Sequence, residues 1–207
     1  MSKSLNTLIG SLMLVAASTA FAASSIDLTV KGLIVPSACV PGLTNGGVVD
    51  YGKVSAKDLN ADKSTSLPIQ ILQFTLDCDA QTLVAMEAKD NREGSDSNND
   101  FLEFGLGMIN GTEKLGGMEL KLFNPLSNGA SISTIGSYDN GANWSSERQL
   151  MRDNILAPAA TGVNAPIAVQ QWTADLHVMP FIAKTSGLTL TNEVVIDGSV
   201  TLIVRYL

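Results

Sequence analysis

Apolar and polar residues alternate in a segment that starts at residue 26, with the sequence IDLTVKGLIV. Every second position carries an apolar residue or glycine, in the order Ile26, Leu28, Val30, Gly32 and Ile34. A period of two predicts a β-strand with one buried face. Because this strand lies near the start of the chain, it can pair with the protein's own sheet or with a sheet of another molecule.

Residues 1–22 have the three parts of a secretory signal peptide. A lysine at position 3 precedes a short apolar run, and the run ends in Ala20-Phe21-Ala22. The run is short for a transmembrane helix, so we expect cleavage after Ala22 rather than an uncleaved membrane anchor. The expected organisation is a signal peptide over 1–22, an N-terminal extension over 23–35 and one domain over 36–207.

The rest of the chain favours an all-β sandwich. Alternating segments are separated by clusters of Gly, Asn, Asp and Ser, the pattern of short strands joined by turns. Residues 124–166 have weak periodicity, and residues 146–156 have the composition of a short helix. A proline at position 180 indicates an edge strand or a bulge. The expected strands are residues 26–35, 48–54, 67–78, 82–88, 101–109, 118–123, 167–183 and 194–206.

The mature chain contains two cysteines, Cys39 and Cys78. An exported chain meets an oxidising compartment, where an isolated pair has one intramolecular pairing. Closing this loop is worth about 4 kcal/mol in the chain-entropy model. A metal site or a catalytic thiol is the alternative, but the chain has one histidine and no CxxC motif.

Composition and motifs argue against several functions. The formal net charge is -7, or -8 without Lys3, so a basic surface for nucleic acid is absent. His177 has no evident nucleophile partner, and no hydrolase, metalloprotease or phosphate-loop motif is present, so we expect neither enzyme activity nor a cofactor. Asp96, Asn98 and Asp100 imitate the start of a calcium loop. The EF-hand pattern then fails at Phe101 and Gly107, and a solvated loop is favoured.

Several of these features together resemble a subunit of chaperone–usher fimbriae, a pilin. They are the signal peptide, the extension ending in VKGLIVPSAC, the second cysteine in FTLDC, and a last strand with tyrosine in the penultimate position. The resemblance covers the N-terminal third and the last strand. One departure is Val194, which occupies a position where pilins often carry glycine. The chain is most similar to a less characterised, pilin-like branch of the family.

The resemblance implies an incomplete immunoglobulin-like sandwich that a donor strand completes. Its partners would be a periplasmic chaperone, an outer-membrane usher and other subunits, and it would be exported through the periplasm to a surface fimbria, with adhesion as an accompanying role. The disulfide would join Cys39 and Cys78. The row from Ile26 to Ile34 would be the donor face. The strand that borders the acceptor groove and meets the chaperone would present Val200, Leu202, Val204 and Tyr206.

Each of these features also has a purely structural interpretation. The first and last strands can be ordinary strands of a complete sandwich. Trp144, in the loop-like sequence NGANWSS, is a candidate contact for a surface glycan, or it packs at the rim of the core. The alternative function is therefore a self-contained, secreted β-sandwich that binds glycans through loop aromatics.

Overall fold

The computed structural model describes Thr29 and residues 38–207. The predicted signal peptide and the row Ile26, Leu28, Val30, Gly32 and Ile34 lie outside the described residues, so both stay predictions. In the part of the chain that is described, no helix is long and apolar enough to cross a membrane.

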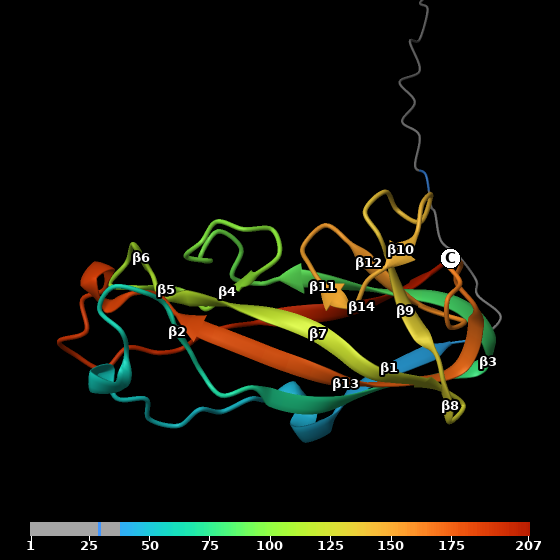
Figure 1. Cartoon of the computed structure of the whole chain (residues 1–207), viewed down its shortest axis with the longest axis horizontal. Helices are drawn as coiled ribbons and strands as arrows, with labels where there is room; N and C mark the ends of the chain where they lie inside the picture. The colour runs from blue at the N-terminus through green and yellow to red at the C-terminus, as the bar shows by residue number, and fades with distance from the viewer. Residues whose placement is uncertain (1–28, 30–37) are drawn as a thin grey trace, which may run out of the picture. The chain divides into compact units, whose positions relative to one another are not determined.

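One long strand, β3 (Gln70–Asp90), is shared by two antiparallel layers (Figure 1). Its first part pairs with β1 (Cys39–Leu43) on one side and with β13 (Ala168–Ile182) on the other. Its last part pairs with β14 (Val200–Tyr206), from Val84 opposite Tyr206 to Asp90 opposite Val200. The strand therefore passes from one layer into the other.

The first layer has the order β1, β3, β13 and β7 (Gly116–Ser127). Leu176 of β13 lies between Leu72 of β3 and Leu122 of β7, and all three are buried. This register follows from the period of two, because alternate residues of neighbouring strands share a face. The short strands of this layer are β2 (Thr65–Ser66), β4 (Phe104–Gly105), β8 (Ala130–Ser131) and β11 (Gln149–Leu150).

The second layer has the order β14, β3, β12 (Ile155–Ala159), β9 (Ser133–Ser137) and β10 (Ser145–Ser146). A separate hairpin joins β5 (Met108–Ile109) to β6 (Glu113–Lys114) through a turn at Asn110 and Gly111, which both have a positive φ. The remaining elements are the 3-10 turns η1 (Thr44–Gly47), η2 (Ala56–Asp58) and η3 (Thr185–Gly187). The structure thus confirms the predicted all-β class and is consistent with a β-sandwich.

The main core lies between the layers. Trp172 is fully buried, and its ring meets Phe74 edge-on with a centroid separation of 5.3 Å. A second, smaller cluster lies on the outer face of the second layer, where Trp144 packs against buried residues of β3, β9 and β12. These residues are Ala85, Ile135, Ile155, Ala157 and Ala159.

Several local predictions are wrong. Residues 101–109 do not form one strand, because 101–103 form a turn and a bend, and β4 and β5 pair with different partners, β7 and β6. The expected helix over 146–156 is instead β10, β11 and the start of β12, because Leu150 pairs with Leu120 and Leu156 with Met86. Non-local pairing of this kind overrides a helical composition. Residues 48–54 form no strand, and Gly52 there has a φ of 58°.

Pro180 marks no edge strand, because β13 lies between β3 and β7. Pro180 lies between Val178, the last residue of β13 that pairs with β3, and Phe181, which pairs with β2. Its carbonyl accepts a 2.9 Å hydrogen bond from the Leu67 amide.

Candidate functional site: an open apolar groove

β1 and β14 are each hydrogen-bonded along one side only. Within the described residues, both strands pair with β3 and with no other strand, β1 in the first layer and β14 in the second. Among the described residues no further strand pairs with their other edges, and an edge of this kind can accept one. No strand pairing therefore joins the two layers at this side of the sandwich.

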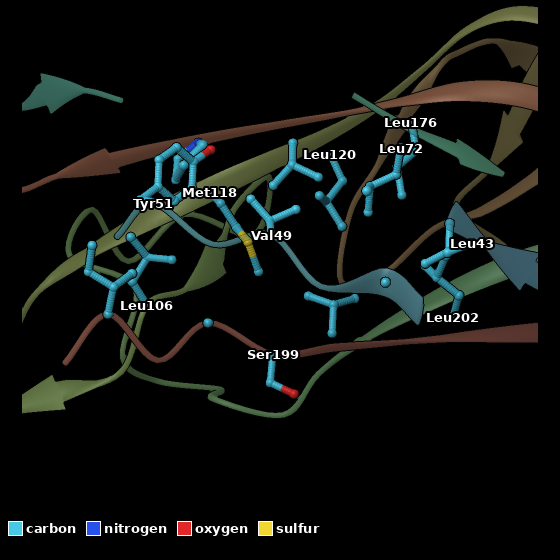
Figure 2. Close-up of a pocket in the computed structure, with 16 residues that line it drawn as sticks. Leu43, Val49, Tyr51, Leu72, Leu106, Met118, Leu120, Leu176, Ser199 and Leu202 are labelled. Carbon is cyan, nitrogen blue, oxygen red and sulfur yellow. The ribbon is translucent and has the colours of Figure 1, made fainter. Parts of the chain in front are cut away.

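A groove runs between these two elements, and three adjoining hollows form it. The first hollow lies between Pro41–Leu43 and Val200–Leu202, and it shares Leu43 with the second hollow. The second shares Val49, Tyr51 and Ile196 with the third. The third hollow is the widest, with a volume of about 670 Å³ between residues 49–59 and 190–196. We call these three hollows together the β1–β14 groove, and Figure 2 shows the lining of the second one.

Apolar side chains from both layers form its floor and its rims. Figure 2 shows Leu72, Leu120 and Leu176 behind the gap, with Val49 and Leu202 on the segments that flank it. The rim side chains pack against the core but are only half-buried. A sandwich with another strand at this position would bury them fully, and burial of apolar area is the main stabilising term in folding. The half-buried rim residues are Leu43, Val49, Tyr51, Val54, Leu190, Val194, Ile196, Val200 and Leu202.

The period of two that was predicted for the end of the chain holds along the second rim. Val194, Ile196, Val200 and Leu202 turn toward the core, while Val195 between them is 76% exposed. Hydrogen-bonded strand, however, begins only at Val200.

Gly198 gives the groove a position without a side chain. A Cβ atom built on Gly198 would lie 2.8 Å from Leu106 Cδ2 and 3.2 Å from Met118 Cε, and both of these side chains line the groove. The backbone of this rim is therefore packed directly onto the floor. Asp197 holds the same segment, because its amide donates to the Leu106 carbonyl and its carboxylate accepts two hydrogen bonds from Arg92.

The wide end of the groove carries an ion pair between the two rims. Lys53 Nζ lies 3.1 Å from Glu193 Oε1, and both side chains are more than nine-tenths exposed. An exposed pair of this kind contributes little to stability. It does show that the rims approach each other within the length of two side chains.

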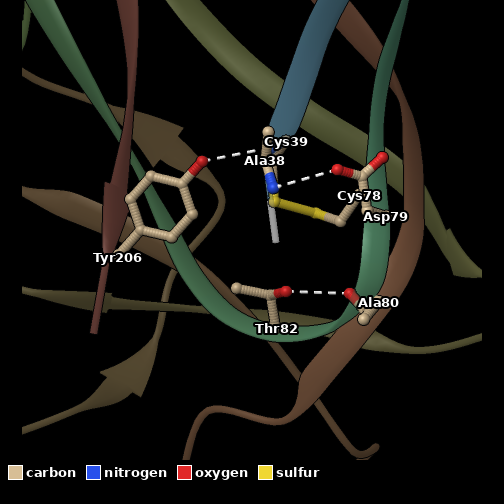
Figure 3. The surroundings of a disulfide bond; sticks show 7 residues. All are labelled: Ala38, Cys39, Cys78, Asp79, Ala80, Thr82 and Tyr206. Carbon is tan, nitrogen blue, oxygen red and sulfur yellow. Dashed lines mark hydrogen bonds between the residues drawn. A yellow bond between two sulfur atoms is a disulfide. The ribbon is translucent and has the colours of Figure 1, made fainter. Parts of the chain in front are cut away.

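The other end of the groove, which we call the narrow end, carries the disulfide that the sequence predicts. Cys39 and Cys78 are bonded and join the start of β1 to β3, where the two residues are also register partners. The Cys39 amide donates to Tyr206 Oη at 3.0 Å, and the Ala38 amide donates to Asp79 Oδ2 at 3.3 Å (Figure 3). Ala38 and Cys39 thus lie at this end of the groove, and Cys39 contacts the C-terminal strand.

The structure brings together only part of the predicted set. Val200 and Leu202 line the groove, Val204 packs against the core beside it, and Tyr206 closes its end. Trp144 lies elsewhere, on the small cluster of the second layer, and its indole N–H donates to the Gly141 carbonyl at 3.0 Å. Its role as a glycan contact stays a prediction.

The sequence pattern did not indicate that residues 49–54, which form the first rim, belong to the site. Val49 and Tyr51 alternate with polar residues, which is why residues 48–54 were predicted to be a strand. Nothing in that pattern indicated that this segment faces Ile196 across a gap, because that relation depends on the packing of the two layers.

Metal chemistry finds no support in the described residues, where no group of three or more His, Cys, Asp or Glu side chains could hold an ion. Asp96 and Asp100 lie in the loop after β3, and the two Asp96 carboxylate oxygens accept hydrogen bonds from the amides of Asn98 and Asp100. The Asp96 carboxylate therefore serves to shape its own loop.

The chain is similar to proteins of Escherichia coli (strain K12). A family model described as "Protein of unknown function (DUF1120)" matches residues 28–112. "Protein GltF" is 27% identical over 239 aligned residues, which cover 93% of this chain and 93% of that protein. "Uncharacterized protein YhcF" is 34% identical over 79 residues, or 38% of this chain and 33% of that protein. The family match includes β1, β3 and both cysteines, and so the first rim of the groove.

Proposed function

We propose that this protein is a structural subunit of a surface fimbria and that a partner's β-strand completes its sandwich. The observation that supports this most directly is the β1–β14 groove. An apolar floor between two strands that each lack a neighbour suits an added strand, because backbone hydrogen bonds supply affinity and alternate side chains fill the hollows.

The proposed donor is the N-terminal extension of a neighbouring subunit. Its apolar face would be the row from Ile26 to Ile34, whose side chains fall on every second position, as a groove lined on one side requires. Nine extended residues span about 30 Å, which is longer than the seven residues of β14.

The proposed partners follow from the same chemistry. An unpaired, apolar groove is an aggregation hazard, so a periplasmic chaperone would supply a temporary strand before the neighbouring subunit does. An outer-membrane usher would then assemble the fibre at the cell surface. The GltF similarity covers nearly the whole length of both chains and leaves this proposal open.

The test uses the domain over residues 36–207 and a synthetic peptide of residues 23–35. The peptide should raise the thermal midpoint of the domain, since a ligand at 100 times its Kd stabilises by about 2.7 kcal/mol. Amide signals from β1, β14 and residues 49–54 should shift in NMR spectra. The matched control is the same peptide with Gly32→Leu, which should bind more weakly because a side chain would stand where the donor backbone passes close to the floor.

Two results would contradict the proposal. One is an unchanged thermal midpoint with the unmodified peptide. The other is a deletion variant that lacks residues 23–34 and still assembles into fibres like the parent.

A further inference from the structure

A polar pocket lies on the outer face of the second layer, apart from the groove. Glu87 of β3 and Arg205 of β14 contribute one side, and the turns that hold Tyr138, Asn140, Arg152 and Asp153 contribute the other. Its volume is about 300 Å³, at the lower end of small-ligand sites. We call it the sheet-face pocket. It is separate from the groove because Arg205 and Glu87 alternate along their strands with Val204 and Met86, which face the main core.

The pocket is held in shape by hydrogen bonds within its walls. Arg205 Nη1 lies 3.3 Å from Glu87 Oε2 and 3.2 Å from Asn140 Oδ1, so one guanidinium joins two walls. Asn154 is 2% exposed and secures the other turn, because it accepts from the Met151 amide at 3.0 Å and donates to the Gln149 carbonyl at 2.9 Å. A preorganised set of polar groups binds with a smaller loss of entropy than a flexible one.

One guanidinium N–H and one exposed aromatic ring at the pocket are not used in these hydrogen bonds. Arg152 Nε is buried and has no hydrogen-bond acceptor among the described residues, while Arg152 Nη2 donates to the Asp100 carbonyl. Tyr138 is 52% exposed, and its hydroxyl is fixed by donation to Glu147 Oε2 at 3.0 Å. A buried guanidinium N–H without an acceptor is unusual in a folded protein, and a ligand can supply the acceptor.

We infer that the sheet-face pocket binds a sugar residue that carries a carboxylate. Two guanidinium groups suit a carboxylate, which accepts paired, charge-assisted hydrogen bonds. Glu87 and Asp153 can accept from sugar hydroxyls, Asn140 can donate to them, and the Tyr138 ring offers an apolar face to the pyranose. A nucleic acid fits less well, because its many phosphates would meet a chain with a formal net charge of -7, whereas a single carboxylate needs only the two guanidinium groups. This inference does not depend on the function proposed for the groove.

The test is an NMR titration of the full-length, exported protein with D-glucuronate, D-glucose and acetate. Glucuronate should shift the amide signals of residues 138–140, 152–155 and 205, and glucose and acetate should each bind about tenfold more weakly or worse. Arg205→Gln should weaken glucuronate binding by about tenfold or more. Arg148→Gln is the matched control, because Arg148 lies over the Phe123 ring, 5.0 Å from its centroid, and does not line the pocket.

Several outcomes would overturn the inference. If glucuronate causes no shifts at these residues, the pocket is not a binding site for it. If acetate binds with equal affinity, the pocket does not recognise the sugar ring. If the Arg205→Gln and Arg148→Gln variants bind glucuronate with equal affinity, the Arg205 guanidinium does not take part in binding. If Arg205→Gln perturbs the spectrum beyond the pocket, Tyr138→Ala serves as the second variant and should also weaken binding. The peptide of residues 23–35 should leave glucuronate affinity unchanged, so a failure at the groove is distinguishable from a failure here.

Discussion

The hydroxyl oxygen of Tyr206 accepts a hydrogen bond from the backbone N–H of Cys39 at 3.0 Å (Figure 3). The two residues are 167 positions apart, and they join the last strand of the second layer to the first strand of the first. Because β1 and β14 pair with no strand except β3 among the described residues, this contact closes the narrow end of the groove. The penultimate tyrosine thus has a structural role that a strand pattern alone does not indicate.

Replacing Tyr206 with phenylalanine removes this hydrogen bond and keeps the ring. We expect the free energy of unfolding to fall by about 1 kcal/mol, the usual net value of one such bond. Hydrogen exchange at the Cys39 amide should become faster, while exchange at the β13 amides follows global stability. An unchanged exchange rate at Cys39 would show that the bond does not persist in solution.

The double variant Cys39→Ala and Cys78→Ala tests the contribution of the disulfide at the narrow end of the groove. The bond encloses a sequence separation of 39 residues, and loss of the cross-link should destabilise the domain by about 4 kcal/mol in the chain-entropy model. Urea unfolding of the variant and of the oxidised parent measures the difference. Adding reductant to the variant should have no further effect, whereas the parent should lose a similar amount of stability.

Gly198→Ala tests the contact between the second rim and the groove floor. The new methyl group would lie 2.8 Å from Leu106 Cδ2, so Leu106 or Met118 must move. We expect a loss of about 1 kcal/mol in stability and weaker binding of the 23–35 peptide, measured by thermal unfolding and titration. Gly187→Ala is the control, since a Cβ there meets no atom within 4 Å. Equal behaviour of the two variants would contradict the prediction.

Glu103 makes stability depend on pH. Burial, a hydrogen bond with Asp96 and the charges of Asp96 and Asp100 raise the pKa of Glu103 from 4.5 to about 7, although Asn98 donates to its carboxylate. Between these two values the folded state binds more protons than the unfolded state, so stability should fall as pH rises through this range. The penalty should be absent below about pH 4.5 and complete above about pH 7.

The Glu103→Gln variant should therefore have a higher thermal midpoint than the parent at about pH 8, and the difference should shrink toward about pH 4. Glu93→Gln is the control, because Glu93 is an exposed glutamate of the same loop. A parent and variant that respond identically to pH would exclude Glu103 as the source.

The sequence by itself determined the elements that depend on local periodicity and on covalent chemistry. Alternation predicted the all-β class, the strand character of residues 167–183, and a face at the end of the chain whose members Val194, Ile196, Val200 and Leu202 turn toward the core. Two cysteines left one intramolecular pairing. These features are local or follow from counting, so neighbouring residues suffice to specify them.

Only the tertiary structure decided which strands lack a neighbour. The groove exists because β3 carries β1 in one layer and β14 in the other, and because residues 49–54 run opposite residues 190–196 without pairing. The sheet-face pocket likewise joins Glu87, Tyr138 and Arg205, which are far apart in the chain. Long-range packing sets these relations, and a pattern of period two carries no information about which distant segment it will face.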